Sequence, residues 1–245
     1  MTATRIIARL DVKPPNVVKG IHLEGFRVVG LPEEKAREYA DAGADEIAYQ
    51  DVVASLYGRN SILDLIEQSA TGVFVPLTLG GGIRSADDAD KALRSGADKV
   101  SINTAAHEHP QLISDLAARF GRQAVVVAIE AKRTSAGWTV MTQAGRDVLE
   151  WAEEAVGLGA GELVLTSIDN EGTMRGFDLD LILAVRGLVD VPLVAHGGCG
   201  SPSDVVAAVE AGADAVAVAS ALHYGRTTIS DIKSAVREAG IEVRL

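Results

Sequence analysis

Two acidic residues stand in matching contexts in the sequence, Asp11 in "LDVK" and Glu130 in "IEAK". Each closes a short apolar run of the kind that forms a buried strand. Two carboxylates that face each other across a pocket can divide the roles of general acid and general base, if their environments separate their pKa values. The alternative, less favoured because the two contexts repeat, is a pair of strand-end acids, solvated or paired with Lys13 and Lys132. Since strand-end acids contribute little to a core, replacing either acid should leave folding little changed.

Two glycine-rich segments indicate sites for anions. Glycines let backbone N–H groups approach an anion, and a helix N-terminus favours negative charge. One Gly-Gly pair is usually only a turn, but here two copies are each followed, one strand later, by small or hydroxyl residues. These sites are formed by Gly81, Gly82, Asn103 and Thr104, and by Gly197, Gly198, Ala219 and Ser220. We therefore expect an elongated substrate with a phosphate at each end and its reacting middle between the two carboxylates.

The elements that position these residues alternate along the whole chain. Short apolar runs predict strands near 5–11, 46–51, 73–79, 98–102, 124–130, 162–167, 191–195 and 214–219. Amphipathic stretches predict helices near 32–43, 59–69, 85–95, 109–119, 147–157, 179–187, 203–212 and 229–239. Eight βα units with right-handed crossovers favour a single (β/α)8 TIM barrel domain over residues 1–245. An open doubly wound sheet is the alternative.

The two halves of the chain resemble each other. Residues 75–106, "VPLTLGGGIRSADDADKALRSGADKVSINTAA", correspond to residues 191–222, "VPLVAHGGCGSPSDVVAAVEAGADAVAVASAL". Such a half-barrel pseudo-twofold repeat places the strand of Asp11 opposite the strand of Glu130. Both acids would then face each other at the C-terminal face, where barrel enzymes carry their chemistry.

Composition narrows the possible partners and the compartment. The net charge of -11 argues against nucleic acid and anionic membranes as partners. No apolar run approaches the ~20 residues of a membrane span, and the N-terminus lacks the order of a signal peptide. A single cysteine, Cys199, cannot form an internal disulfide, which suits a reducing cytoplasm.

Six motifs together resemble the cyclase subunit of imidazole glycerol phosphate synthase, the HisF family. They are "RIIARLDVKPPNVVKG", "LTLGGGIRS", "GADKVSINTAA", "QAVVVAIEAKR", "LTSIDNEGTMRGFD" and "GADAVAVASALHY", and the match covers nearly the whole chain. A sister barrel, the phosphoribosylformimino isomerase of the same pathway, shares the two phosphate sites. That isomerase lacks the "VVKG" lysine and usually has a Gly-Thr pair where "INT" stands here.

The resemblance implies a lyase/cyclase of histidine biosynthesis. In that family, ammonia from a glutaminase subunit (HisH type) attacks a bisphosphorylated aminoimidazole carboxamide ribonucleotide (PRFAR), giving imidazole glycerol phosphate and AICAR. By position, Asp11 and Glu130 are catalytic, Lys19 lies in the loop that covers the substrate, and Glu171 and Gly172 line the substrate. The two glycine-rich segments bind its phosphates. No cofactor and no metal are implied.

Two further expectations concern segments outside the acid pair. Lys19 lies in residues 12–31, and a connection that long is usually functional or disordered, so we expect a lid. Four charged residues stand at the starts of predicted strands and match the family's ammonia gate at the N-terminal barrel face, where the glutaminase docks. They are Arg5, Glu46, Lys99 and Glu162. The alternative is that they form the solvated lower rim of the barrel.

The chain departs from the family pattern at five places. Glu130 and Glu171 stand where aspartates are usual, Arg9 replaces a cysteine, and His196 replaces a serine. The segment after the fifth strand, residues 134–151, is several residues shorter than usual. These changes motivate two alternatives: a paralogue that uses glutaminase-derived ammonia on another acceptor, forming an amidine, or a catalytically weak glutaminase-docking subunit.

The remaining candidates are single residues. His196 is either a general acid or phosphate donor, or a histidine that points into the barrel or along its rim. Cys199 is interpreted as a small filler, because no base is clearly aimed at it. His107 and His109, in "HEHP", are expected at the surface.

Overall fold

The computed structural model describes residues 3–54, 63–142 and 145–244. Within these residues, eight parallel strands form a closed ring, because the last pairs with the first: Arg5–Ala8 of β1 pair with Ala215–Val218 of β11. The ring consists of β1 (Arg5–Lys13), β4 (Glu46–Asp51), β5 (Leu77–Gly80), β6 (Lys99–Ile102), β7 (Val125–Thr134), β9 (Glu162–Ser167), β10 (Leu193–His196) and β11 (Ala215–Val218). The predicted (β/α)8 TIM barrel is therefore confirmed, and the open-sheet alternative is wrong.

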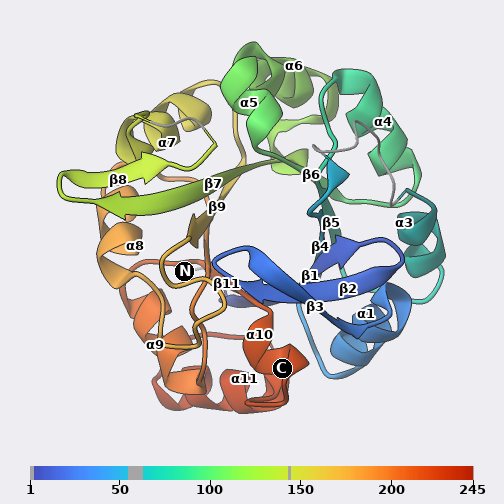
Figure 1. Ribbon diagram of the computed structural model, residues 1–245, viewed down its shortest axis with the longest axis vertical. Helices are drawn as coiled ribbons and strands as arrows, with labels where there is room; N and C mark the ends of the chain where they lie inside the picture. Colours follow the sequence, from blue (N-terminus) through green and yellow to red (C-terminus); the bar gives the residue numbers. More distant parts are fainter. Residues whose placement is uncertain (1–2, 55–62, 143–144, 245) are drawn as a thin grey trace.

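Helices surround the ring in chain order (Figure 1). They are α1 (Pro32–Asp41), α3 (Leu63–Ala70), α4 (Ala86–Arg94), α6 (Gln111–Phe120), α7 (Val148–Gly157), α8 (Leu179–Arg186), α9 (Pro202–Glu210) and α11 (Ile229–Glu238). Short helices α5 (Thr104–Glu108) and α10 (Ser220–His223) follow β6 and β11, and a 3-10 turn, η1 (Arg122–Ala124), precedes β7. Residues 59–62 of the second predicted helix lie outside the described residues. No described helix is long and apolar enough to cross a membrane.

Alternation along β1 separates the outer core from the barrel interior. Side chains of a strand point to opposite faces in turn. The even-numbered residues Ile6, Ala8, Leu10 and Val12 belong to the large core between strands and helices. Ile7 belongs instead to a small interior cluster with residues of β10 and β11. The odd-numbered side chains of β1 therefore face the barrel interior, one layer about every 6.6 Å along the strand.

The half-barrel repeat is visible in the positions of the strands. β4, β5 and β6 begin at Glu46, Leu77 and Lys99, and β9, β10 and β11 begin 116 positions later in each case. β1 and β7 are equivalent in a further respect, since each continues beyond the ring into an antiparallel ribbon. The predicted opposition of the first and fifth βα units follows from this arrangement.

Two ribbons at the barrel mouth differ from the prediction. Residues 12–31 are not an irregular loop but continue β1 into β2 (Asn16–Ile21) and β3 (Glu24–Gly30), which lie across the ring in Figure 1. The connecting residues His22 and Leu23 both have positive φ, as a tight hairpin turn requires. Likewise β7 does not end at Glu130 but extends to Thr134 and pairs with β8 (Gly137–Val140). The apolar residues of both extensions are interrupted by charged residues and glycines, so an apolar-run criterion stops too early.

The predicted surface position of His107 is wrong. Its side chain is buried in α5 and packs on the Trp151 ring of α7, with centroids 4.6 Å apart and an interplanar angle of 39°. Neither ring nitrogen has a hydrogen-bond partner among the described protein groups. Burial, aided by the nearby Arg146, lowers the pKa of His107 to about 4. His109 is exposed, as predicted.

Burial of neutral His107 makes stability depend on pH. Its folded pKa lies below the unfolded value, so the unfolded state binds more protons as pH falls, and stability is lost below about pH 6.5. His107→Phe keeps the ring packing without titrating. Between pH 7 and pH 5 it should therefore lose up to about 2 kcal/mol less unfolding free energy than the unsubstituted chain.

Urea unfolding at the two pH values, at constant ionic strength, measures this difference. His109→Phe is the matched control, because His109 is exposed. The same loss of stability in His107→Phe and in the unsubstituted chain would show that His107 is not buried as a neutral ring.

Candidate active site

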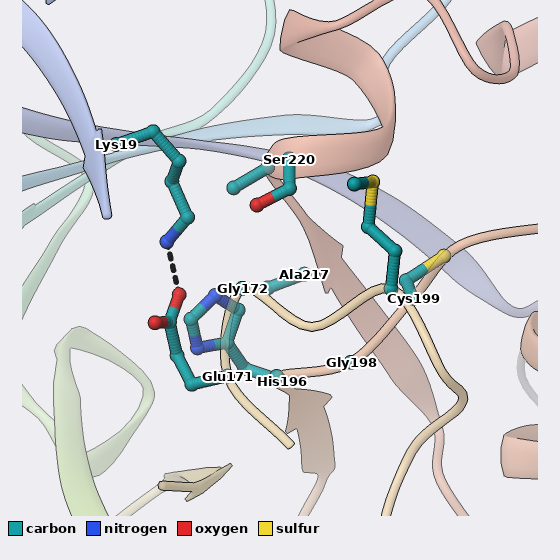
Figure 2. Close-up of a pocket in the computed structure, with 11 residues that line it drawn as sticks. Lys19, Glu171, Gly172, His196, Gly198, Cys199, Ala217 and Ser220 are labelled. Atoms are coloured by element: carbon teal, nitrogen blue, oxygen red, sulfur yellow. Dashed lines mark hydrogen bonds and ion pairs between the residues drawn. The ribbon is translucent and has the colours of Figure 1, made fainter. Parts of the chain in front are cut away.

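Asp11 is the centre of a buried chain of alternating charges at the barrel mouth. Its side chain is fully buried, and it accepts hydrogen bonds from Arg9 Nε at 2.8 Å and from Lys19 Nζ at 2.9 Å. Lys19 Nζ also donates to Glu171, a contact drawn in Figure 2. Glu171 in turn accepts from the backbone N–H of Leu23 at 3.1 Å. The ion chain therefore ties the β2–β3 ribbon to the barrel.

This environment fixes the ionisation of Asp11. Burial alone would raise the pKa of Asp11, but the neighbouring Arg9 and Lys19 cations outweigh it and hold that pKa well below its usual range. Asp11 therefore stays a carboxylate at neutral pH. The less favoured alternative, pairing with Lys13, is wrong, because Lys13 is exposed and the partners of Asp11 are Arg9 and Lys19.

Glu130 lies on β7 in the opposite half of the repeat, and its pKa is shifted the other way. Burial raises the pKa of Glu130 above its usual value, although Arg9 and a hydrogen bond from Asn103 oppose the shift. The alternative pairing with Lys132 is also wrong, because Lys132 binds Asp169. The two carboxylates thus have pKa values separated in opposite directions, which is the condition for an acid–base pair.

The first predicted anion site lies open at the mouth. Gly81, Gly82, Asn103 and Thr104 line a cleft of about 490 Å³, which Arg9 and Glu130 also line. Gly81 has a φ of +92°, and a Cβ there would lie 2.4 Å from the carbonyl oxygen of Asp51. Only glycine fits this approach.

The second predicted anion site is closed. Gly197, Gly198, Ala219 and Ser220 line a cavity of about 10 Å³ together with Lys19, Glu171, Gly172 and His196 (Figure 2). That volume holds about one water molecule. The two sites, expected to be equivalent, differ in free volume: Lys19 of the ribbon fills space at the second site, whereas Leu23 and Phe26 of the same ribbon line the wider first one. A phosphate can enter it only if these side chains move.

His196 and Cys199 border the second site as neutral groups. His196 is buried at the end of β10, where its Nδ1 lies 3.2 Å from Thr166 Oγ1. Burial, together with Arg9 and Lys19, lowers the pKa of His196 well below its usual value, so a cationic general acid is disfavoured there. Burial raises the pKa of Cys199 to about 12, which supports its interpretation as a filler.

The four charged residues at the strand starts form a closed ring at the other end of the barrel. Arg5 contacts Glu46 at 2.9 Å and Glu162 at 2.5 Å. Lys99 contacts the same two glutamates, at 2.8 and 3.1 Å. Above this ring lies an interior cavity of about 30 Å³, lined by the apolar layer at Ile7 and extending to Arg9. Two cations and two anions neutralise one another, as a largely buried set requires.

Comparison with known proteins assigns this sequence to a family. A family model for histidine biosynthesis proteins matches residues 5–228. The chain belongs to this family. Among its relatives, the imidazole glycerol phosphate synthase subunit HisF of Legionella pneumophila is 57% identical, over 82% of this chain and 97% of the relative. The HisF subunits of Beutenbergia cavernae and Streptomyces coelicolor are 49% and 48% identical, each over 99% of both chains.

These matches confirm the resemblance drawn from the sequence motifs, and with it the predicted class of enzyme, a lyase/cyclase of histidine biosynthesis. In this member of the histidine biosynthesis family, the two anion sites and the two acids lie at one end of the barrel and the charged ring lies at the other. Among the described residues, no group of three or more His, Cys, Asp or Glu side chains is arranged to hold a metal ion.

Arg9 is visible in the sequence as a departure from the family pattern, but its connection to Asp11 was not predicted. The signal was the spacing of two along one strand, which puts Arg5, Ile7, Arg9 and Asp11 on the same face of β1. Gln50 was missed altogether. It pairs in register with Asp11 and lines the open cleft beside Arg9 and Glu130.

Because Asp11 holds two buried cations, its removal should destabilise the fold, contrary to the sequence-based expectation. Asp11→Asn keeps the shape of the side chain but leaves Arg9 and Lys19 without their shared anion. We expect a loss of about 3–5 kcal/mol in unfolding free energy, measured by urea unfolding at pH 7. Glu130→Gln is the matched control and should change stability by less than about 1 kcal/mol. Equal effects of the two substitutions would contradict the central role of Asp11.

Proposed function

We propose that the chain catalyses the ammonia-dependent cyclisation of PRFAR to imidazole glycerol phosphate and AICAR. The observation that carries the proposal is the pair of repeat-related carboxylates, Asp11 and Glu130, with oppositely shifted pKa values. Ammonia addition and ring closure need a proton removed from the attacking nitrogen and protons delivered to departing groups. Glu130 carries these protons, while the permanently ionised Asp11 stabilises positive charge that develops on the attacking nitrogen.

The two anion sites bind the phosphates of the substrate in this proposal. The open cleft at Gly82, Asn103 and Thr104 receives one phosphate directly. The other enters the closed site at Gly198 and Ser220 once the ribbon lifts and Lys19 leaves Glu171. Lys19 then lies beside the arriving anion, and its ammonium group is available to pair with it.

Ammonia arrives, we propose, from a glutaminase subunit (HisH type) at the N-terminal barrel face. The relatives named above are each called a subunit of a synthase. On this face, the loops before β5 and β10 expose Phe74 and Leu188, apolar side chains suited to a protein contact. The charged ring and the interior cavity lie between that face and the mouth. A cytoplasmic location, expected from the single cysteine, stays a prediction.

A second candidate keeps the ammonia and changes the acceptor, forming an amidine on another molecule. The closed second anion site favours it, because a substrate with one phosphate would need only the open cleft. A catalytically weak docking subunit has less support, since an acid–base pair with separated pKa values serves no docking purpose.

Substitution of either carboxylate tests the proposed chemistry. With PRFAR and ammonium chloride, Asp11→Asn and Glu130→Gln should each lower turnover by about 10²–10⁴-fold. Because burial raises the pKa of Glu130, its ionisation should appear in the pH–rate profile above the ordinary glutamate range and vanish in Glu130→Gln. Glu108→Gln, an exposed acid lining the same cleft, is the control. Near-normal turnover in both variants would refute the assignment.

The length of Glu130 distinguishes the two acceptors. If PRFAR is the substrate, Glu130→Asp should retain or improve turnover of PRFAR with ammonia, because the shorter acid is the one usual in the family. If the acceptor differs, PRFAR should give no product with either protein, and Glu130→Asp should impair the native reaction, since a misplacement of ~1 Å costs roughly 10²-fold. Product formation by the unsubstituted chain would exclude the second candidate.

A further inference from the structure

Two hollow spaces meet at one pair of side chains inside the barrel. The interior cavity of about 30 Å³ extends from the charged ring, at Glu46 and Glu162, up to Arg9 and Gln50. The cleft of about 490 Å³ at the mouth begins at the same two residues and continues to Glu130. Of the residues lining these two spaces, Arg9 and Gln50 are the ones they share. Arg9 and Gln50 therefore form a partition between the interior cavity and the cleft.

Arg9 is positioned in this partition by its place on β1 and by a hydrogen bond to Asp11. It is 8% exposed and lies on β1 between the apolar layer at Ile7 and the carboxylate of Asp11. Its Nε donates to Asp11 Oδ1 at 2.8 Å. Gln50 completes the partition from β4, where its side chain packs so closely over Gly80 that a Cβ there would lie 2.2 Å from Gln50 Oε1.

The partition has a charge as well as a shape. The guanidinium of Arg9 is always protonated, and it faces negative groups on the mouth side, namely Asp11, Glu130 and Glu171. On the other side lies the apolar layer at Ile7. Glu46 and Glu162, at the far end of the interior cavity, are already paired with Arg5 and Lys99, so the partners open to Arg9 lie at the mouth, where an anionic substrate would add further ones. A long, flexible side chain with such partners can move toward the cleft without losing its charge compensation.

We propose that Arg9 is a positioning residue with two tasks in the cyclase reaction: it aligns Asp11, and it closes the interior cavity until its side chain moves toward the cleft. Ammonia that travels through the barrel must then pass position 9, whereas ammonia from solvent reaches the cleft directly. This inference rests on the proposed function. Beyond that function, delivery of ammonia from the N-terminal face to the cleft depends on the size of the side chain at position 9.

Two variants separate the tasks. Arg9→Ala and Arg9→Met both remove the cationic partner of Asp11, but only Arg9→Ala empties the passage. The experiment uses the full chain in complex with its glutaminase subunit and PRFAR, and compares glutamine-driven with ammonium-driven product formation. Ammonium-driven turnover should fall about tenfold, and equally, in both variants. Glutamine-driven turnover should be at least about fivefold higher in Arg9→Ala than in Arg9→Met.

Further measurements test whether Arg9 aligns Asp11. Loss of Arg9 should move the acid limb of kcat/KM toward higher pH, because Asp11 and Glu130 both lose a cation that lowers their pKa values. Arg9→Lys should largely restore ammonium-driven turnover and the pH profile. Arg84→Ala removes a different arginine of the cleft, one that does not line the interior cavity, and should affect both nitrogen sources equally.

The outcomes are distinct. If the unsubstituted complex forms no product from PRFAR and ammonium, the proposed function fails before Arg9 is tested. If that complex is active but Arg9→Ala and Arg9→Met respond alike to glutamine, Arg9 closes no passage. Unchanged ammonium-driven turnover in both variants overturns the alignment of Asp11. Should the Arg9 variants not fold, Gln50→Ala and Gln50→Met test the other half of the partition, with the same expected difference in glutamine-driven turnover.

Discussion

A buried anion shared by two cations organises the mouth of this barrel. Asp11 is fully buried, and it is tolerated there because Arg9 and Lys19 both donate to it. Each cation extends the effect of Asp11 in a different direction. Lys19 also pairs with Glu171, so the ion chain ties the β2–β3 ribbon to the barrel beside the second anion site. Arg9 lines the interior cavity, so the ion chain also extends to that cavity. The closed second site and the partition inside the barrel are two ends of one ion chain.

The same ion chain explains why two carboxylates in repeated positions have become different. Asp11 has two cations in direct contact, whereas Glu130 has only the more distant influence of Arg9 and a hydrogen bond from Asn103. Burial raises the pKa of both acids, and the cations reverse that shift at Asp11 alone. Equivalent positions of the half-barrel repeat thus hold two carboxylates whose surroundings shift their pKa values in opposite directions.

Much of this could be predicted from the sequence, and the limits have physical causes. The apolar runs identified the ring strands, because each run is a local pattern. The repeat placed Asp11 opposite Glu130, because equivalent segments of the two halves can be matched directly in the sequence. The ring at Arg5 and Lys99 followed from the family resemblance. The ribbons were not predicted, because their apolar residues are interrupted by charged residues and glycines, and their strands pair antiparallel beyond the ring. The burial of His107 and the closure of the second anion site depend on contacts between segments far apart in the chain, which no local pattern records.

The charged ring at the N-terminal face has a final consequence for how the two halves depend on each other. Its glutamates, Glu46 and Glu162, begin equivalent strands of the repeat, but its cations, Arg5 and Lys99, both come from the first half. A barrel built from two copies of the first half would gather two arginines and two lysines around two glutamates. Two copies of the second half would leave two glutamates facing each other with no cation. Neither half can therefore close the ring as a neutral set by itself, and each half of the repeat is electrostatically incomplete without the other.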